Sequence, residues 1–166
     1  MNILWFANVA LPEASNLMAE RPSPYGGWMI GAANMLAKEQ DVHLSIAFPH
    51  RGEKDYQKYK GLKITYYPFK EVSDRRAATG TNVGYIEELI ADAKPDIVHV
   101  FGSEMAHSLV VLRFCRSRNL KAVLSIQGLV SVCALHMFSG LPCRVIYGNT
   151  LRNILRRDSV NGLRHR

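Results

Sequence analysis

The sequence predicts an α/β fold, a Rossmann-like doubly wound parallel sheet with helices covering both faces. Three observations lead to this prediction. Short apolar or β-branched segments alternate with segments of helical periodicity along most of the chain. The first apolar segment begins almost at residue 1 and is largely uninterrupted, which is typical of a central strand buried on both faces. At 166 residues, with 48% hydrophobic side chains, the chain is long enough to form one sizeable core.

Five segments are predicted to form the strands of this sheet. They span residues 2–9, 42–48, 61–69, 96–102 and 121–126. Apolar residues at every second position mark the second segment, and β-branched and aromatic residues mark the third. We expect the third strand to end at Pro68, because proline has no backbone N–H to donate.

Three helices are predicted between these strands. A loop rich in Pro, Ser and Glu at residues 10–24 precedes the first helix, which begins at Gly26 and Gly27. The second helix covers residues 83–93, where apolar residues recur at helical spacing up to a Lys-Pro pair.

The third helix is expected to begin after Ser103, whose hydroxyl can cap its first turn. Arginines gather in its last turn, where the helix dipole favours positive charge. Its inward-facing side chains are predicted to be Met105, Leu109, Leu112 and Cys115.

We expect one globular domain over residues 1–147, followed by a basic helical segment over residues 148–166 that the end of the chain interrupts. No apolar run approaches the roughly 18 residues that a membrane span needs. The first residues also lack the basic flank and cleavage site of a signal peptide. These features predict a cytoplasmic protein.

Motif searches exclude several kinds of chemistry. The sequence has no GxGxxG after the first strand, no nucleophile elbow and no GxxxxGK[ST] phosphate loop. The six histidines show no pair at metal-ligand spacing, so no metal site is expected, and His43 and His99 are interpreted as core histidines within strands. The three widely spaced cysteines are expected to be reduced and mostly buried.

Residues that follow strands are the best candidates for ligand contact, because parallel sheets bind ligands beyond the carboxyl ends of their strands. The glycine pair that opens the first helix suits a phosphate, and it also suits a plain tight turn. An acidic residue at the start of the third helix can contact a ligand or compensate the helix dipole. An amide beside a glycine can bind a sugar hydroxyl or simply shape a loop. These candidates are Gly26, Gly27, Glu104, Gln127 and Gly128.

The charge of the chain is strongly uneven. The net charge is +7, but residues 1–112 carry −2 and residues 113–166 carry +9. The basic candidates for contact with an anionic membrane surface or an acceptor phosphate are Arg144, Arg152, Arg156 and Arg157. The same arginines can form a solvated face. Nucleic acid is not expected as a partner, because few aromatic residues lie among the positive charges.

Three sequence segments together resemble a known family. They are YGGW at residues 25–28, KPDIVHVFGSE at residues 94–104 and KAVLSIQGLVS at residues 121–131. In this order they are similar to the N-terminal domain of family 4 retaining glycosyltransferases of the GT-B class, over roughly residues 1–145. Two positions differ from the family pattern, since Phe101 and Gln127 stand where the family often has histidine.

The resemblance implies that the chain is the acceptor-side half of a glycosyltransferase. Such an enzyme transfers a sugar from a nucleotide-sugar donor to a glycan or lipid-linked acceptor in surface polysaccharide synthesis, without a metal or other cofactor. Gly26 and Gly27 would form the donor diphosphate loop, while Glu104 and Gln127 would contact the acceptor or the sugar.

The resemblance also implies that these residues alone are inactive. The family's nucleotide-binding pattern, two glutamates separated by seven residues, is absent from this sequence. The chain is therefore expected to precede the half that holds the nucleotide sugar. The alternative is a non-catalytic subunit that anchors a separate catalytic chain to the inner face of the membrane.

Overall fold

The computed structural model describes residues 1–52, 55–71, 84–126, 132, 136 and 140–143. The chain divides into two compact units, Met1–Gln127 and Gly128–Arg166. Nearly all described residues belong to the first unit, whose fold follows. The domain boundary predicted after residue 147 and the basic helical segment at 148–166 lie outside the described residues.

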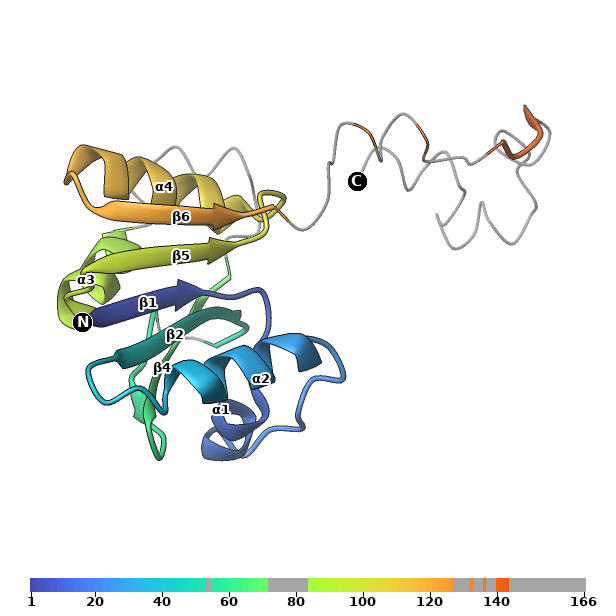
Figure 1. The fold of residues 1–166 in the computed structure, drawn as a ribbon. Helices are drawn as coiled ribbons and strands as arrows, with labels where there is room; N and C mark the ends of the chain where they lie inside the picture. The colour runs from blue at the N-terminus through green and yellow to red at the C-terminus, as the bar shows by residue number, and fades with distance from the viewer. Residues whose placement is uncertain (53–54, 72–83, 127–131, 133–135, 137–139, 144–166) are drawn as a thin grey trace. The chain divides into compact units, whose positions relative to one another are not determined.

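The first unit contains the doubly wound α/β sheet that the sequence predicts (Figure 1). Six strands lie in the order β3-β4-β2-β1-β5-β6. All neighbours pair in parallel except β3 and β4, which are antiparallel. The strands are β1 (Asn2–Phe6), β2 (His43–His50), β3 (Tyr59–Lys60), β4 (Ile64–Lys70), β5 (Ile97–Phe101) and β6 (Lys121–Ser125).

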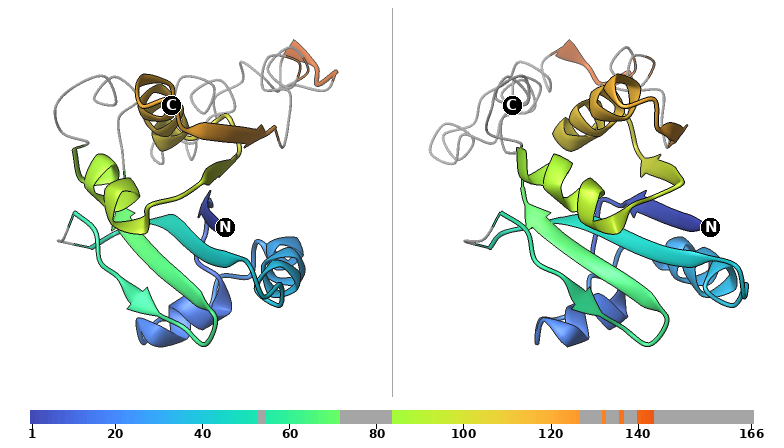
Figure 2. Two further views of the ribbon diagram at one scale, coloured as in Figure 1. Left: turned by 60° about the vertical axis from the view of Figure 1, so that its left-hand side comes forward. Right: turned by 90° about the vertical axis from the view of Figure 1, so that its left-hand side faces the viewer.

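Helices cover both faces of the sheet (Figures 1 and 2). The helices are α1 (Pro12–Leu17), α2 (Gly27–Leu36), α3 (Gly84–Ala93) and α4 (Ala106–Ser117). Leu4 and Phe6 of β1 point toward α3 and α4, whereas Trp5 points toward α1 and α2, because side chains alternate along a strand. Burial of a large apolar side chain such as Phe6 contributes about 2 kcal/mol to folding.

Helix α1 corrects the prediction of a loop at residues 10–24. Pro12 is tolerated because the N–H groups of the first helical turn have no acceptor within the helix. Ala14 and Ser15 lie on the buried face of the helix. The composition of this segment is typical of turns and does not indicate so short a helix, which tertiary packing stabilises.

Several predicted boundaries also differ. Strand β1 ends at Phe6 rather than residue 9, and β4 continues through Pro68 to Lys70. Proline interrupts the hydrogen bonding only on its N–H side. The carbonyl oxygen of Pro68 still accepts a bond from the Gln57 N–H at 3.0 Å, which keeps this stretch in the sheet.

Helix α4 begins later than predicted, and its inward face is predicted only in part, since Leu112 and Cys115 pack in the core whereas Leu109 does not. Its N-cap is Met105, without a side-chain cap bond, so Ser103 does not cap it. Leu109 is 46% exposed, while His107 and Ser108 are buried. The apolar pattern predicted Leu109 to face inward, but a histidine and a serine occupy two of the buried positions of the helix instead. Cys115 is buried as predicted, and Cys143 is exposed.

The carboxylate of Glu13 connects α1 to the turn between β3 and β4. Glu13 Oε1 accepts a bond from the Leu62 N–H at 2.8 Å, and Oε2 accepts one from the Tyr66 hydroxyl at 2.7 Å. Burial and this carboxylate raise the pKa of Tyr66. We expect Glu13→Ala to lower the free energy of unfolding by about 1–2 kcal/mol, because the partly buried hydroxyl loses its acceptor.

Urea denaturation at pH 7 measures this effect. Glu39→Ala, which removes an exposed carboxylate after α2, is the matched control and should change stability by less than about 0.5 kcal/mol. Equal effects of the two substitutions would contradict the structural role of Glu13.

None of the helices within the described ranges combines the length and hydrophobicity needed to cross a bilayer.

Candidate functional site

The connections reverse direction between β1 and β5, which lie side by side at the centre of the sheet. From β1 the chain proceeds outward through β2 and β4, and from β5 it proceeds the other way to β6. In open α/β sheets, a ligand crevice forms beyond the carboxyl ends of the two strands at such a switch point. The segments after Phe6 and Phe101 therefore frame the candidate site.

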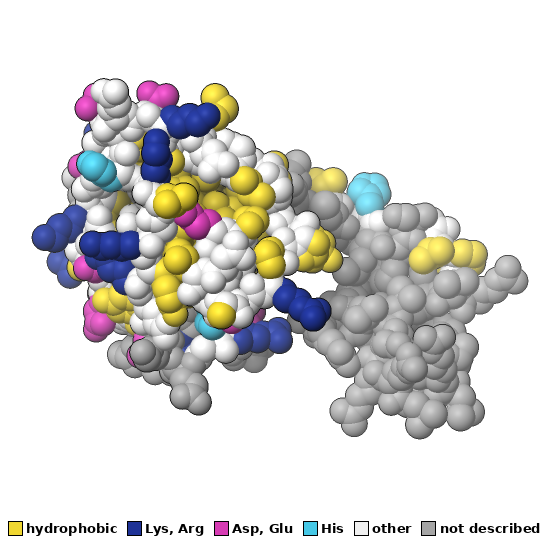
Figure 3. Space-filling view, turned by 90° about the horizontal axis from the view of Figure 1, so that it is seen from below, with side chains coloured by type: hydrophobic (Ala, Val, Ile, Leu, Met, Phe, Trp, Pro, Cys, Tyr) yellow, Lys and Arg dark blue, Asp and Glu magenta, His cyan; other side chains and the backbone are white. Residues whose placement is uncertain are grey.

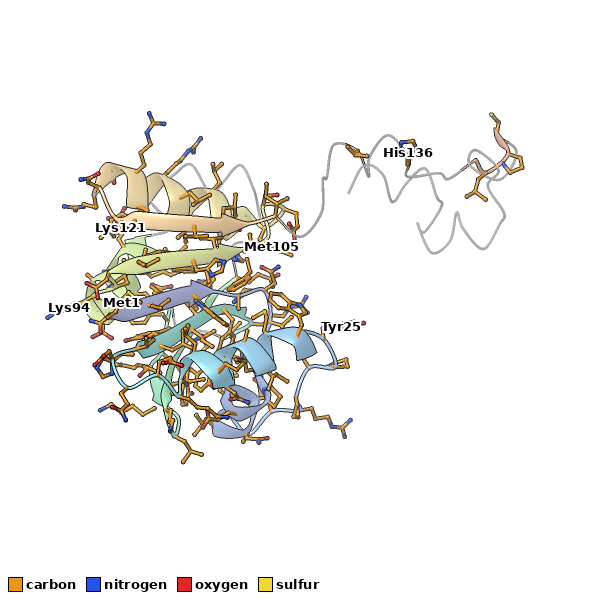
Figure 4. The ribbon with its side chains drawn as sticks, viewed as in Figure 1. Met1, Tyr25, Lys94, Met105, Lys121 and His136 are labelled. Carbon is orange, nitrogen blue, oxygen red and sulfur yellow. The ribbon has the colours of Figure 1, made fainter. Side chains whose placement is uncertain are left out.

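Labelled side chains in Figure 4 mark the two edges of the sheet. Met1, Lys94 and Lys121 lie at the amino ends of β1, β5 and β6, whereas Tyr25 and Met105 lie at the carboxyl edge. Tyr25 belongs to the connection before α2 and Met105 to the connection before α4. The segments that begin α2 and α4 thus approach the same edge of the sheet.

Gly26 and Gly27 begin α2 at this edge, as predicted, and they play different parts. Gly26 is the N-cap in the left-handed conformation, with φ +83°. A Cβ there would lie 2.7 Å from Val9 Cγ2, so only glycine fits. A Cβ at Gly27 would meet nothing within 4 Å. Gly27 thus leaves open space beside the amides that begin the helix, of which the Met29 N–H donates to the Gly26 carbonyl at 2.9 Å. The amides of a first helical turn generally point out of the helix toward a ligand.

Gly102, Asn8 and Glu104 form a polar cluster beyond β1 and β5. Gly102 has φ +87°, and a Cβ on it would lie 2.6 Å from Glu104 Oε1 and 2.9 Å from Asn8 Nδ2. The Gly102 N–H donates to the Ser125 carbonyl at 2.8 Å, and its own carbonyl accepts from Ser108 Oγ at 2.7 Å. Backbone bonds on both sides therefore fix the glycine that brings these two side chains together.

Asn8 carries a buried amide oxygen, Oδ1, that has no hydrogen-bond partner in the described part of the chain. A buried acceptor of this kind costs about 1–3 kcal/mol unless a ligand or water donates to it. A ligand that donates an O–H or N–H at this end of the sheet would satisfy it.

A hollow of about 290 Å³ extends this edge toward the carboxyl end of β2. Arg21, Ser23 and His50 contribute polar groups to its lining. His50 Nε2 lies 2.8 Å from Glu20 Oε1, which connects the end of β2 to the segment after α1. The hollow provides a second set of polar groups on the same edge of the sheet.

A larger groove of about 560 Å³ lies elsewhere, between α1, α2 and the start of β4. Figure 3, which views the molecule from below, shows hydrophobic side chains gathered on the surface around an acidic group, with basic side chains nearby. The groove is lined by Ile64, the first residue of β4, and is therefore distant from the carboxyl ends of the strands.

The predicted site residues divide into three that the structure describes and six that it does not. Gly26, Gly27 and Glu104 lie at the carboxyl edge, although Glu104 precedes α4 instead of standing in its first turn. The others lie outside the described residues: Gln127, Gly128, Arg144, Arg152, Arg156 and Arg157.

Sequence reasoning did not single out Asn8 or Gly102 as individual site residues. Asn8 had a signal, because it is the polar residue that ends the first apolar run. Gly102 had one as well, since a glycine directly after a strand is suited to positive φ.

The histidine predictions have mixed outcomes. His43 is exposed at the amino end of β2, so its assignment to the core was wrong. His99 is partly buried, its Nε2 lies 2.7 Å from Ser125 Oγ, and burial lowers its pKa. Within the described ranges, no group of three or more His, Cys, Asp or Glu side chains is arranged to bind a metal ion.

No family model matches the sequence, and comparison with curated proteins finds no match. Among solved structures, the FeoB G-domain from Methanococcus jannaschii matches 93% of this chain and 80% of its own chain, with 13% sequence identity and a TM-score of 0.30. A similarity this weak supports no inference about function.

Proposed function

We propose that the chain is the acceptor-side domain of a retaining glycosyltransferase of the GT-B class. The enzyme would transfer a sugar from a nucleotide-sugar donor to a glycan or lipid-linked acceptor in surface polysaccharide synthesis. It would work in the cytoplasm, with peripheral contact to the anionic inner face of the membrane. The donor nucleotide would bind mainly to a second domain of the enzyme.

The observation that carries the proposal is the convergence of Asn8, Glu104 and the Gly26–Gly27 turn on the switch-point edge. Asn8 Oδ1 can accept a bond from a sugar hydroxyl, and so can the carboxylate of Glu104. Both groups are acceptors that suit the hydroxyls of a sugar. The specific assignment to glycosyl transfer comes from the resemblance of the three sequence segments.

Gly27 has a distinct role in this proposal. Glycosyl transfer releases a nucleoside diphosphate, whose negative charge grows in the transition state. Free amides and the positive end of the α2 dipole would stabilise this charge if the diphosphate approached the backbone at Gly27. The open space at Gly27 permits this approach.

Gly27→Ala tests this role against Gly31→Ala in the same helix. Neither substitution causes a contact within 4 Å, so both proteins should fold. We expect Gly27→Ala to weaken nucleotide-sugar binding by about tenfold or more, because the methyl group blocks the approach to the amides. Gly31→Ala should bind normally and gain up to about 1 kcal/mol of stability.

The measurement is calorimetric titration of the protein at its natural length with UDP- and GDP-linked sugars. Failure of both nucleotide classes to bind would overturn the proposed function. Equal affinities of the two alanine variants would overturn the role of Gly27 alone.

A further inference from the structure

Trp28 is a large aromatic side chain placed on the surface next to the candidate site. It is 57% exposed, whereas Trp5, the other tryptophan of the chain, is 5% exposed. An indole ring usually buries most of its area, because exposure of its apolar surface to water is unfavourable. An exposed indole beside a ligand-binding edge therefore indicates a surface that a ligand covers.

A contact with a buried ring supports Trp28. Its ring packs edge-on against Phe101, with centroids 5.3 Å apart and planes at 62°. Phe101 is itself 3% exposed, stacks on His99 at 4.0 Å and meets Trp5 edge-on at 4.9 Å. The exposed ring thus rests on one buried ring of β5, which is itself packed between rings of β1 and β5. A preorganised ring loses little conformational entropy when a ligand stacks on it.

Polar groups that suit one class of ligand follow directly after the ring that supports Trp28. Phe101, which supports Trp28, directly precedes Gly102, where Asn8 and Glu104 meet. A carboxylate and an amide oxygen accept bonds from hydroxyl groups, and a carboxylate repels phosphate. A ligand that fits both features has one flat apolar face and a rim of hydroxyls, as a pyranose sugar does.

We propose that Trp28 is the stacking surface for a pyranose ring of the acceptor, whose hydroxyls bind to Asn8 and Glu104. The identification of this ring as the acceptor's rests on the proposed function, whereas the stacking itself does not. Trp28 would thereby determine which acceptors bind, by favouring sugars that present a continuous apolar face of C–H groups.

The two tryptophans allow a direct test by NMR. A ¹⁵N–¹H spectrum of the full chain contains two indole N–H signals, and Trp28→Phe identifies which belongs to Trp28. The ligands are methyl pyranosides of glucose, galactose, mannose and N-acetylglucosamine. Mannitol is the control for hydroxyl groups without a ring, and UMP is the control for a nucleobase.

The expected result is a saturable shift of the Trp28 signal with at least one pyranoside and none with mannitol. Trp28→Ala should weaken binding of that pyranoside by about tenfold or more, and Trp28→Phe by less, since a smaller ring remains. Met35→Ala removes a 72% exposed apolar side chain near the other end of α2 and should leave binding unchanged.

Three outcomes would overturn the inference. They are no pyranoside shift at Trp28, unchanged affinity in Trp28→Ala, and a shift with UMP in place of the sugars. Circular dichroism of Trp28→Ala confirms that the variant is folded. If pyranosides bind at Trp28 while no nucleotide sugar binds the natural protein, the stacking site stands and the proposed function fails. If nucleotide sugars bind and pyranosides do not, the function stands and this inference fails.

Discussion

Lowering the pH from 7 to 4 should cost the first unit about 3 kcal/mol of unfolding free energy through His107 alone. Burial lowers the pKa of His107 from 6.5 to about 4. The side chain is 3% exposed, its ring lies 5.3 Å from that of Phe69, and its Nε2 has no hydrogen-bond partner in the described part of the chain. Neither the Phe69 ring nor any hydrogen bond to Nε2 stabilises the charged imidazolium in this part of the structure.

The sign follows from the two protonation equilibria. Between pH 6.5 and about 4 the unfolded chain binds a proton that the folded chain does not, so stability falls as pH decreases through this range. It should level off below about pH 4, where the folded form is protonated as well. Above pH 6.5 the histidine is neutral in both states, so none of this stability is lost.

His107→Leu is the variant that isolates this contribution. It should be at least as stable as the wild type at pH 7, because leucine fills the apolar site without an unpaired nitrogen. Urea denaturation at pH 7, 5 and 4 gives the difference between the two proteins. Other groups, such as the Lys58–Asp92 pair at 2.7 Å, are present in both and cancel. Parallel pH profiles would show that His107 is not the source.

Gly102→Ala should lower the free energy of unfolding by about 2–3 kcal/mol and disturb the candidate site. A side chain at φ +87° costs about 1–2 kcal/mol by itself. The new Cβ would also lie only 2.6 Å from Glu104 Oε1 and 2.9 Å from Asn8 Nδ2, so both side chains would have to move. The backbone cannot turn away easily, because it would break bonds to Ser125 and Ser108.

The measurement combines urea denaturation with titration of nucleotide sugars and pyranosides. Gly84→Ala is the control, because it lies at the start of α3, meets nothing within 4 Å and has no positive φ. It should be as stable as the wild type or slightly more stable. A Gly102→Ala protein with normal stability would refute the strained conformation. Normal ligand binding despite lower stability would show that Asn8 and Glu104 are not at the site.

Much of the fold was predictable because it depends on local periodicity. Strand β5 lies at residues 97–101 and β6 at residues 121–125, within one or two residues of prediction. Their apolar runs are too short for a typical helix and are bounded by polar residues or glycine, which together favour a strand. Helix α1 was missed for the converse reason, because six residues are too few to show a period.

The candidate site was predictable only in part. Gly26 and Gly27 were recognised because a glycine pair before a helix has few conformational alternatives. The meeting of Asn8 with Glu104 was not, because 96 positions of sequence separate residues that only the pairing of β1 with β5 brings together. The sequence likewise does not distinguish Trp28 from the other residues of its helix. Its exposure and its contact with Phe101 at the end of β5 are visible only in the structure.

The sequence by itself determined the alternation of strands and helices and the parallel sheet, because period, apolar runs and glycine positions act over a few residues. Only the tertiary structure decided the face that α4 buries and the strand order that makes β1 and β5 neighbours. It also decided that His107 is enclosed among aromatic rings while Trp28 is left exposed. These properties depend on contacts between distant segments, whose free energy is gained only when the whole sheet is assembled.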